Sequence, residues 1–308
     1  MSRCSHGRLG ELAAAFALLV FALLLPTAQY HNLPPEHSAQ LSFPVKLRGT
    51  WCSARALAPN ATGACAAEKA AGTRAWMQVS TASLGLMALV MPIAWLVAQH
   101  WRAVRRSGGG GATARAQTAH PFGGKLCAWR DGSVGLMLAL AIAALLTNAI
   151  KRAAGRPRPN FYALMALDPT FYGGAAYRSF PSGHASASMA GLHFLALWLR
   201  ASAVTCLAPS AHRGVASLVL GCAVFAPTAL AVWVAVTRIQ DHWHGYADVL
   251  AGSLIGFAAA HRGFMHAAAH AASAGHRFGV YATLGGEKGA AALNDELQLQ
   301  PEAVVGGV

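Results

Sequence analysis

Long apolar stretches alternate with polar, Arg-rich and Gly-rich segments along this 308-residue chain. A helix needs about 20 mostly apolar residues to cross a bilayer. Six stretches approach that length and predict an all-α, polytopic membrane helix bundle: Leu12–Tyr30, Thr81–Gln99, Ser133–Ile150, Ala185–Val204, Val215–Val236 and Ala247–Ala260. The first is short and follows Arg3 and Arg8, so it fits either a retained helix or a cleaved signal peptide.

Composition supports a membrane protein. Hydrophobic residues make up 55% of the chain and charged residues only 11%, against about 25% charged residues in soluble domains. The formal net charge is +13, which in a soluble protein would suggest a nucleic-acid partner. No basic stripe interleaved with aromatic residues occurs here, so we expect no nucleic acid. The excess is better explained by basic loops beside membrane helices and by a site for an anion.

The charge distribution also predicts topology. Segment 100–130 carries six Arg and Lys residues before its first acidic neighbour, Asp131, which places it in the cytoplasm by the positive-inside rule. The segments after the third span, before the fourth and between the fifth and sixth then share the opposite face. We expect residues 1–261 to form the membrane domain and residues 262–308, which are rich in Ala, Gly and His, to be a largely disordered cytoplasmic tail.

One loop carries two weak signals of an oxidising compartment. Cys52 and Cys65 flank the sequon Asn60-Ala61-Thr62, so a disulfide and a glycan are both possible if this loop is lumenal or extracellular. The six cysteines show no spacing typical of a zinc site. The oligomeric state and the membrane of residence are left open.

Three polar clusters fall on the predicted non-cytoplasmic face, within segments 148–162, 177–188 and 236–250. They contain cations whose donors suit phosphate oxygens, a helix start that can present amides to an anion, and side chains able to transfer protons or attack phosphorus. The cations are Lys151, Arg158 and Arg238, and the helix start is Ser182 and Gly183. The side chains able to transfer protons or attack are His184, His244 and Asp248.

His244 and Asp248 are four residues apart, so on a helix they would share a face. A carboxylate against one imidazole nitrogen fixes the tautomer and leaves the other nitrogen free to attack. Each cluster alone also has a purely structural explanation. Basic residues beside a span commonly snorkel, Pro-Ser-Gly commonly caps a helix, and Trp243 and Tyr246 are typical interfacial aromatics. The occurrence of all three clusters on one face favours a functional site.

The clusters resemble the three-part signature of the phosphatidic acid phosphatase type 2 superfamily. The matching residues are Lys151 with Arg158-Pro159, then Pro181-Ser182-Gly183-His184, then Arg238 with His244 and Asp248. The surrounding sequence is similar to eukaryotic lipid phosphate phosphatases, including plant-type phosphatidate phosphatases, from about the third span to the sixth. Two positions depart from the usual pattern: Thr237 stands where Ser is common, and Gly245 where relatives often have a second His.

The resemblance implies that the protein hydrolyses phosphatidate and related lipid phosphates or pyrophosphates through a phosphohistidine. His244 would be the nucleophile, Asp248 would orient it, and His184 would be the general acid and base. Lys151, Arg158, Ser182, Gly183 and Arg238 would hold the phosphoryl group. Three cations around a phosphate would remove the need for Mg²⁺, so we expect no metal and no cofactor, with membrane lipids as the surroundings.

Other functions fit the same scaffold. A prenyl or polyprenyl pyrophosphate phosphatase, or a lipid phosphotransferase, would use the same residues. A non-catalytic relative or a transporter is less compatible, because inactive relatives typically lack part of the His/Asp set. The expected location is a multi-pass protein of an endomembrane or the plasma membrane, with its site facing the lumen or the exterior.

Overall fold

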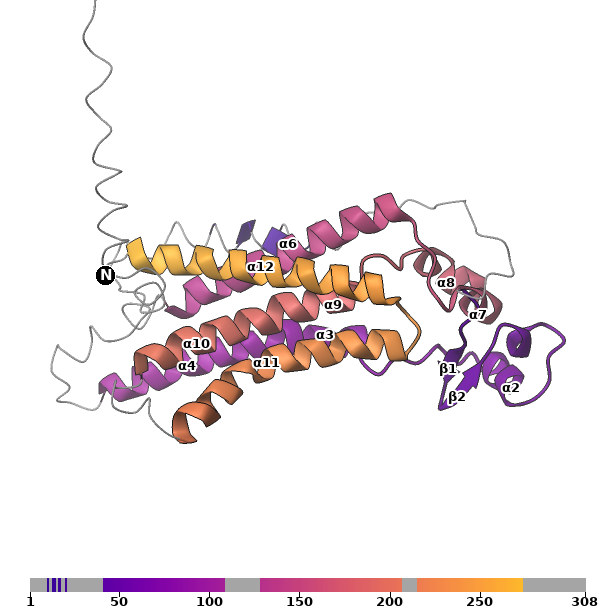
Figure 1. Ribbon diagram of the computed structural model, residues 1–308, viewed down its shortest axis with the longest axis horizontal. Coiled ribbons are helices and arrows are strands. Elements are labelled where there is room, and N and C mark those ends of the chain that lie inside the picture. The colour runs from indigo at the N-terminus through magenta and orange to yellow at the C-terminus, as the bar shows by residue number, and fades with distance from the viewer. Residues whose placement is uncertain are drawn as a thin grey trace, which may run out of the picture.

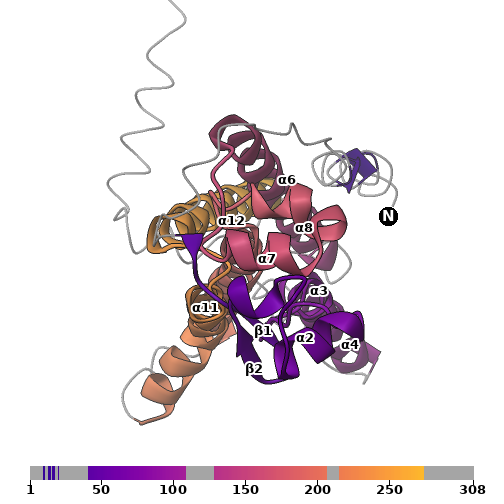
Figure 2. The same ribbon diagram turned by 90° about the vertical axis from the view of Figure 1, so that its right-hand side faces the viewer.

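The computed structural model describes residues 41–108, 128–206 and 215–273, with a few isolated positions between Gly10 and Val20. In these residues, five long helical runs lie side by side in a membrane bundle, and a smaller cap sits at one end of it (Figures 1 and 2). The predicted first span lies mostly outside the described residues, and the tail beyond Ser273 lies wholly outside them.

The bundle helices alternate with polar connections, as the hydropathy pattern predicts. Two runs contain a π-helical turn (η3 and η4) and are continuous through it. The runs are α3 (Thr81–Gly85), η3 (Leu86–Val90) and α4 (Met91–Gly108); α6 (Ala128–Ala154); α9 (Gly183–Ser188), η4 (Met189–His193) and α10 (Phe194–Cys206); α11 (Val215–Gln240); and α12 (Tyr246–Ser273). Each described predicted span lies within one of these runs.

Three segments of the described residues are long and apolar enough to cross a membrane: Thr81–Gln99, Arg130–Ala154 and Gly221–Gln240. The run of residues 183–206 and α12 are also helical, but they contain more Gly, Ser and His. Six spans therefore stay a prediction. The predicted tail boundary at residue 262 differs from the structure, because α12 continues to Ser273. Its last turns are rich in Ala, a strong helix former, and they bury Phe264 and Ala267 in the bundle core.

α12 packs along α6 and against α9 and η4, and glycines make this contact close. A Cβ atom at Gly252 or Gly256 would overlap the carbonyl oxygen of Ser182 or Ser186, respectively. Small residues spaced by four let helix backbones approach in this way. The contact holds the start of α9 directly beside the start of α12.

The cap is built from segments 41–80 and 155–180. Its elements are β1 (Val45–Leu47), β2 (Thr50–Cys52), η2 (Arg55–Leu57), α2 (Ala64–Ala70), α7 (Phe161–Leu167) and α8 (Pro169–Ala176). The antiparallel pair β1–β2 is a small departure from the all-α prediction. It turns through Arg48 and Gly49, both with positive φ, which is the backbone that a two-residue hairpin requires.

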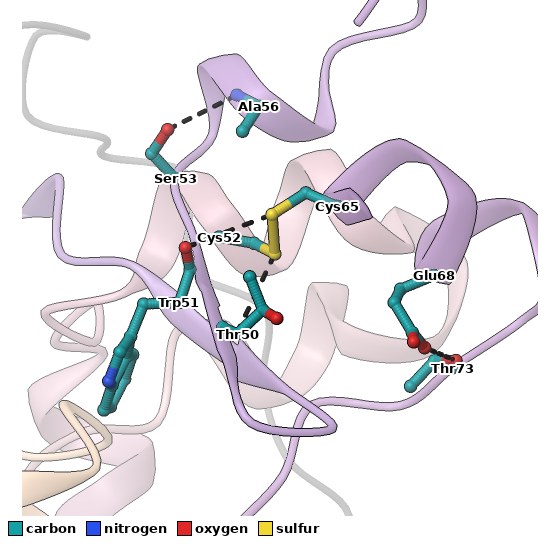
Figure 3. The surroundings of a disulfide bond; sticks show 8 residues. All are labelled: Thr50, Trp51, Cys52, Ser53, Ala56, Cys65, Glu68 and Thr73. Atoms are coloured by element: carbon teal, nitrogen blue, oxygen red, sulfur yellow. Dashed lines mark hydrogen bonds between the residues drawn. A yellow bond between two sulfur atoms is a disulfide. The ribbon is translucent and has the colours of Figure 1, made fainter. Parts of the chain in front are cut away.

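Cys52 and Cys65 form a disulfide that ties β2 to α2 (Figure 3). Around it, Val45, Leu47 and Leu57 pack against residues of α7 and α8. Trp243, which the sequence suggests as an interfacial aromatic, instead lies buried in this cap core. The cap therefore packs against the loop between α11 and α12 through Trp243.

Candidate active site

The three polar clusters meet at the junction of the bundle and the cap. The amide of Ser182 donates to the Asp248 carbonyl (2.8 Å), which joins the start of α9 to α12. Lys151 Nζ at the end of α6 donates to the Arg178 carbonyl (2.9 Å). An Nη of Arg158 donates to the Trp243 carbonyl (3.2 Å). Segments nearly 100 residues apart in sequence thus share one site.

His244 lies between a cation and a carboxylate. Its Nε2 is 3.3 Å from an Nη of Arg158, and its Nδ1 is 3.8 Å from Asp248 Oδ2. The second distance is too long for a hydrogen bond, but catalytic contacts are often long without a ligand. Burial and the charge of Arg158 hold the pKa of His244 well below its usual range. The imidazole is therefore neutral at neutral pH, which is the form that can attack phosphorus.

The helical spacing predicted for His244 and Asp248 is wrong in one respect. α12 begins at Tyr246, so His244 precedes the helix. The Asp248 carboxylate reaches back instead, and its Oδ2 accepts from the Gly245 amide (2.9 Å), as an acidic residue in the first turn of a helix commonly does. This brings the carboxylate to His244 without a shared helical face.

Asp248 has two further partners that the sequence did not indicate. Ser179 Oγ donates to Asp248 Oδ2, and an Nη of Arg156 contacts Oδ1 at 3.1 Å. Asp248 is buried, with 1% of the residue exposed, so these contacts hold a charged carboxylate that would otherwise be costly to bury. Ser179 lies just before the Pro-Ser-Gly-His segment, and that proximity is its only signal in the sequence.

His184 lies in the first turn of α9 with one ring nitrogen free. The backbone of Val79 hydrogen bonds to its ring, while Nε2 has no partner among the described residues. The charges of Arg238, Arg158 and Lys151 all act on this ring. Val79 therefore orients the imidazole, and Nε2 is the nitrogen available for proton transfer.

Arg238 is fully buried, with 0% of the residue exposed. One Nη donates to Thr237 Oγ1 (2.9 Å) and to Asp241 Oδ2 (3.2 Å). Asp241 Oδ2 also accepts from the backbone amide of Gln78 (2.8 Å). The other Nη has no partner among the described residues. Thr237 thus retains the hydroxyl contact despite replacing Ser, and Arg238 keeps donors for an anion.

The remaining predicted phosphate ligands, Ser182, Gly183 and Arg158, lie beside the other site residues, and each has a different set of contacts. Ser182 caps α9 by accepting from the Ala185 amide (3.4 Å) and is buried, and this bond leaves its hydroxyl proton for a phosphate oxygen. A Cβ at Gly183 would lie 3.8 Å from the Lys151 side chain, so Gly183 borders that cation. Burial lowers the pKa of Arg158 to about 10, which still leaves it charged at neutral pH.

This arrangement suits phosphoryl transfer. The charges of Lys151 and Arg158 act on both imidazoles, and fixed positive charge stabilises the charge that develops on a transferring phosphoryl group. Within the described residues, no group of three or more His, Cys, Asp and Glu side chains is placed to hold a metal ion.

Sequence comparisons show which known proteins this chain is similar to. The chain is 40% identical over 138 residues to "Lipid phosphate phosphatase 1" of Arabidopsis thaliana, covering 40% of each chain. It is 38% identical over 144 residues to "Lipid phosphate phosphatase 2" of that plant, covering 41% of this chain and 47% of the relative. It is 33% identical over 148 residues to "Diacylglycerol pyrophosphate phosphatase 1" of Saccharomyces cerevisiae, covering 42% and 48%.

This chain thus spans 40–48% of the length of these relatives. No solved structure matches it. Residues 132–271, from α6 through nearly all of α12, match the family described as "PAP2 superfamily", and this range contains all three clusters. Residues 132–271 of the chain are therefore similar to the PAP2 superfamily.

Proposed function

We propose that this protein is a lipid phosphate phosphatase that hydrolyses phosphatidate and related lipid phosphates through a phosphohistidine, without Mg²⁺. The observation that carries the proposal is the His244 imidazole, buried and neutral, with Asp248 on one side and Arg158 on the other. The names of the relatives, which specify lipid phosphate and diacylglycerol pyrophosphate phosphatases, support the substrate class.

The reaction has two steps. His244 Nε2 attacks phosphorus, the bond from phosphorus to the lipid oxygen breaks, and His184 gives that oxygen a proton, which releases diacylglycerol from phosphatidate. Water then attacks the phosphohistidine while His184 takes its proton, and the P–N bond breaks to release phosphate. Lys151, Arg158 and Arg238 offset the charge on the phosphoryl oxygens in both steps.

The site should work without a divalent metal. Full-length protein in detergent should release phosphate from phosphatidate at the same rate with EDTA as with added Mg²⁺, because three side-chain cations already supply the positive charge. Phosphate release is measured colorimetrically, with heat-denatured protein as the control. A strict requirement for Mg²⁺ would refute the metal-free mechanism, and no release from any lipid phosphate would refute the proposed function.

The membrane helices and the family make this an integral membrane protein, and we propose that it is multi-pass with its site on the lumenal or exterior face. The Cys52–Cys65 disulfide supports this orientation, because disulfides persist in oxidising compartments. The disulfide lies in the same cap that holds Trp243, next to His244.

The orientation can be tested by glycosylation. Asn60 is exposed in the cap, so expression in eukaryotic cells should give a glycan that a glycosidase removes and that Asn60→Gln abolishes. The matched control is Gly111→Asn in the Asn60→Gln background, which creates the same Asn-Ala-Thr sequon in the predicted cytoplasmic loop and should stay unmodified. A glycan at position 111, together with no glycan at Asn60 in the wild type, would show that the orientation is opposite to the one proposed.

A further inference from the structure

Two partly buried cations beside the site have no role in the proposed reaction. Arg152 lies in the last turn of α6, and Arg178 lies between α8 and Ser179. Nε and one Nη of Arg152, together with Nε of Arg178, are buried without a hydrogen-bond partner among the described residues. A buried guanidinium nitrogen left unpaired is costly, so these donors point to a ligand that is not part of the chain.

The two guanidinium groups interact electrostatically. Burial, and after it the charge of Arg152, lower the pKa of Arg178. A Cβ at Gly174 would lie 3.4 Å from an Nη of Arg178, which places this guanidinium against the bare backbone of α8. Two like charges in a partly buried place repel each other, and an anion between them would remove that repulsion.

The pair borders the phosphate site. The Arg178 carbonyl accepts from Lys151 Nζ (2.9 Å), and the charge of Arg178 acts on both Lys151 and Arg158. Arg152 directly follows Lys151 in α6. An anion held by Arg152 and Arg178 would therefore lie next to a phosphoryl group held by Lys151 and Arg158, as two linked phosphates require.

We propose that Arg152 and Arg178 form a second anion subsite, which binds the inner phosphate of a lipid pyrophosphate. The inference rests on the proposed function. His244 attacks the terminal phosphorus, the bond from that phosphorus to the bridging oxygen breaks, and the electron pair stays on that oxygen. The leaving group is a lipid monophosphate, and the two arginines stabilise its added negative charge. Phosphatidate has no inner phosphate, so its hydrolysis does not use the pair.

The test compares two substrates. The double variant Arg152→Gln/Arg178→Gln, as full-length protein in detergent, should lose at least about tenfold in kcat/KM for diacylglycerol pyrophosphate relative to phosphatidate, since charge-assisted hydrogen bonds are the strong ones. The control is Arg55→Gln, which removes one positive charge from an exposed position in the cap and should change neither rate. Equal losses on both substrates, or no loss on either, would overturn the subsite.

A binding experiment separates this proposal from the proposed function. Inorganic pyrophosphate should bind wild-type protein more tightly than inorganic phosphate, and the double variant should lose that preference while its affinity for phosphate is unchanged. This result would support the subsite even in a protein that turns over no lipid, whereas equal pyrophosphate binding by wild type and variant would refute it. Activation of phosphatidate hydrolysis by phosphatidylglycerol vesicles, abolished in the double variant, would instead assign the pair to a neighbouring lipid and overturn the pyrophosphate assignment.

Discussion

His244→Gln should reduce phosphate release from phosphatidate by at least about 10³-fold, because loss of a covalent nucleophile leaves only the binding and electrostatic parts of catalysis. Gln keeps a polar side chain of similar length beside Arg158 and Asp248, so the buried site need not collapse. The measurement is kcat in detergent at saturating substrate. His261→Gln on α12, outside the site, should keep wild-type activity.

A labelling experiment can detect the phosphohistidine intermediate. His184→Gln lacks the base that activates water, so hydrolysis of the phosphohistidine should be slow. The substrate is a ³²P-phosphate ester with a good leaving group, because such a group departs with little help from an acid. Labelled protein should therefore accumulate. The label should be acid-labile and stable in alkali, as a phosphohistidine is, and absent in the double variant with His244→Gln. Label that survives loss of His244, or wild-type turnover by His244→Gln, would contradict the assignment of the nucleophile.

Periodicity and motif spacing were enough to place the five described helical runs of the bundle and to select residues that the structure brings close together, but they did not predict the short helices of the cap. They worked because a membrane span is a local property of about 20 residues, and because each cluster lies at the end of such a span. The hairpin β1–β2 and the burial of Trp243 were not predictable in this way. Both depend on a cap assembled from segments 41–80 and 155–180, whose mutual contacts leave no local pattern.

The positioning residues escaped prediction for the same reason. Ser179 and Arg156 are 69 and 92 residues from Asp248 in sequence, and Val79 reaches His184 from the cap side of the chain. The spacing of His244 and Asp248 was informative, but it suggested a shared helical face where the structure has a carboxylate folded back onto the helix start. Their spacing in the sequence limited the distance between His244 and Asp248, but it did not determine the backbone conformation between them.

Gly252→Val should lower activity at least about 100-fold and reduce thermal stability, although residue 252 lies outside the proposed chemistry. A side chain there would overlap the Ser182 carbonyl, so α12 and α9 would have to separate. That separation would break the hydrogen bond from the Ser182 amide to Asp248 (2.8 Å) and move His184 away from His244. Overpacking of a close helix contact typically costs 1–3 kcal/mol, and a misplacement of about 1 Å can cost about 10²-fold in rate.

Gly221→Val is the matched control, because it also places Val in a membrane helix, but nothing lies within 4 Å of a Cβ there. It should retain activity and melting temperature in the same detergent. Gly252→Ser, with a smaller side chain, should fall between Gly252→Val and wild type in both measurements. If Gly252→Val is as active as Gly221→Val, then close contact between α9 and α12 is not what positions His184, and the Val79 contact must do so alone.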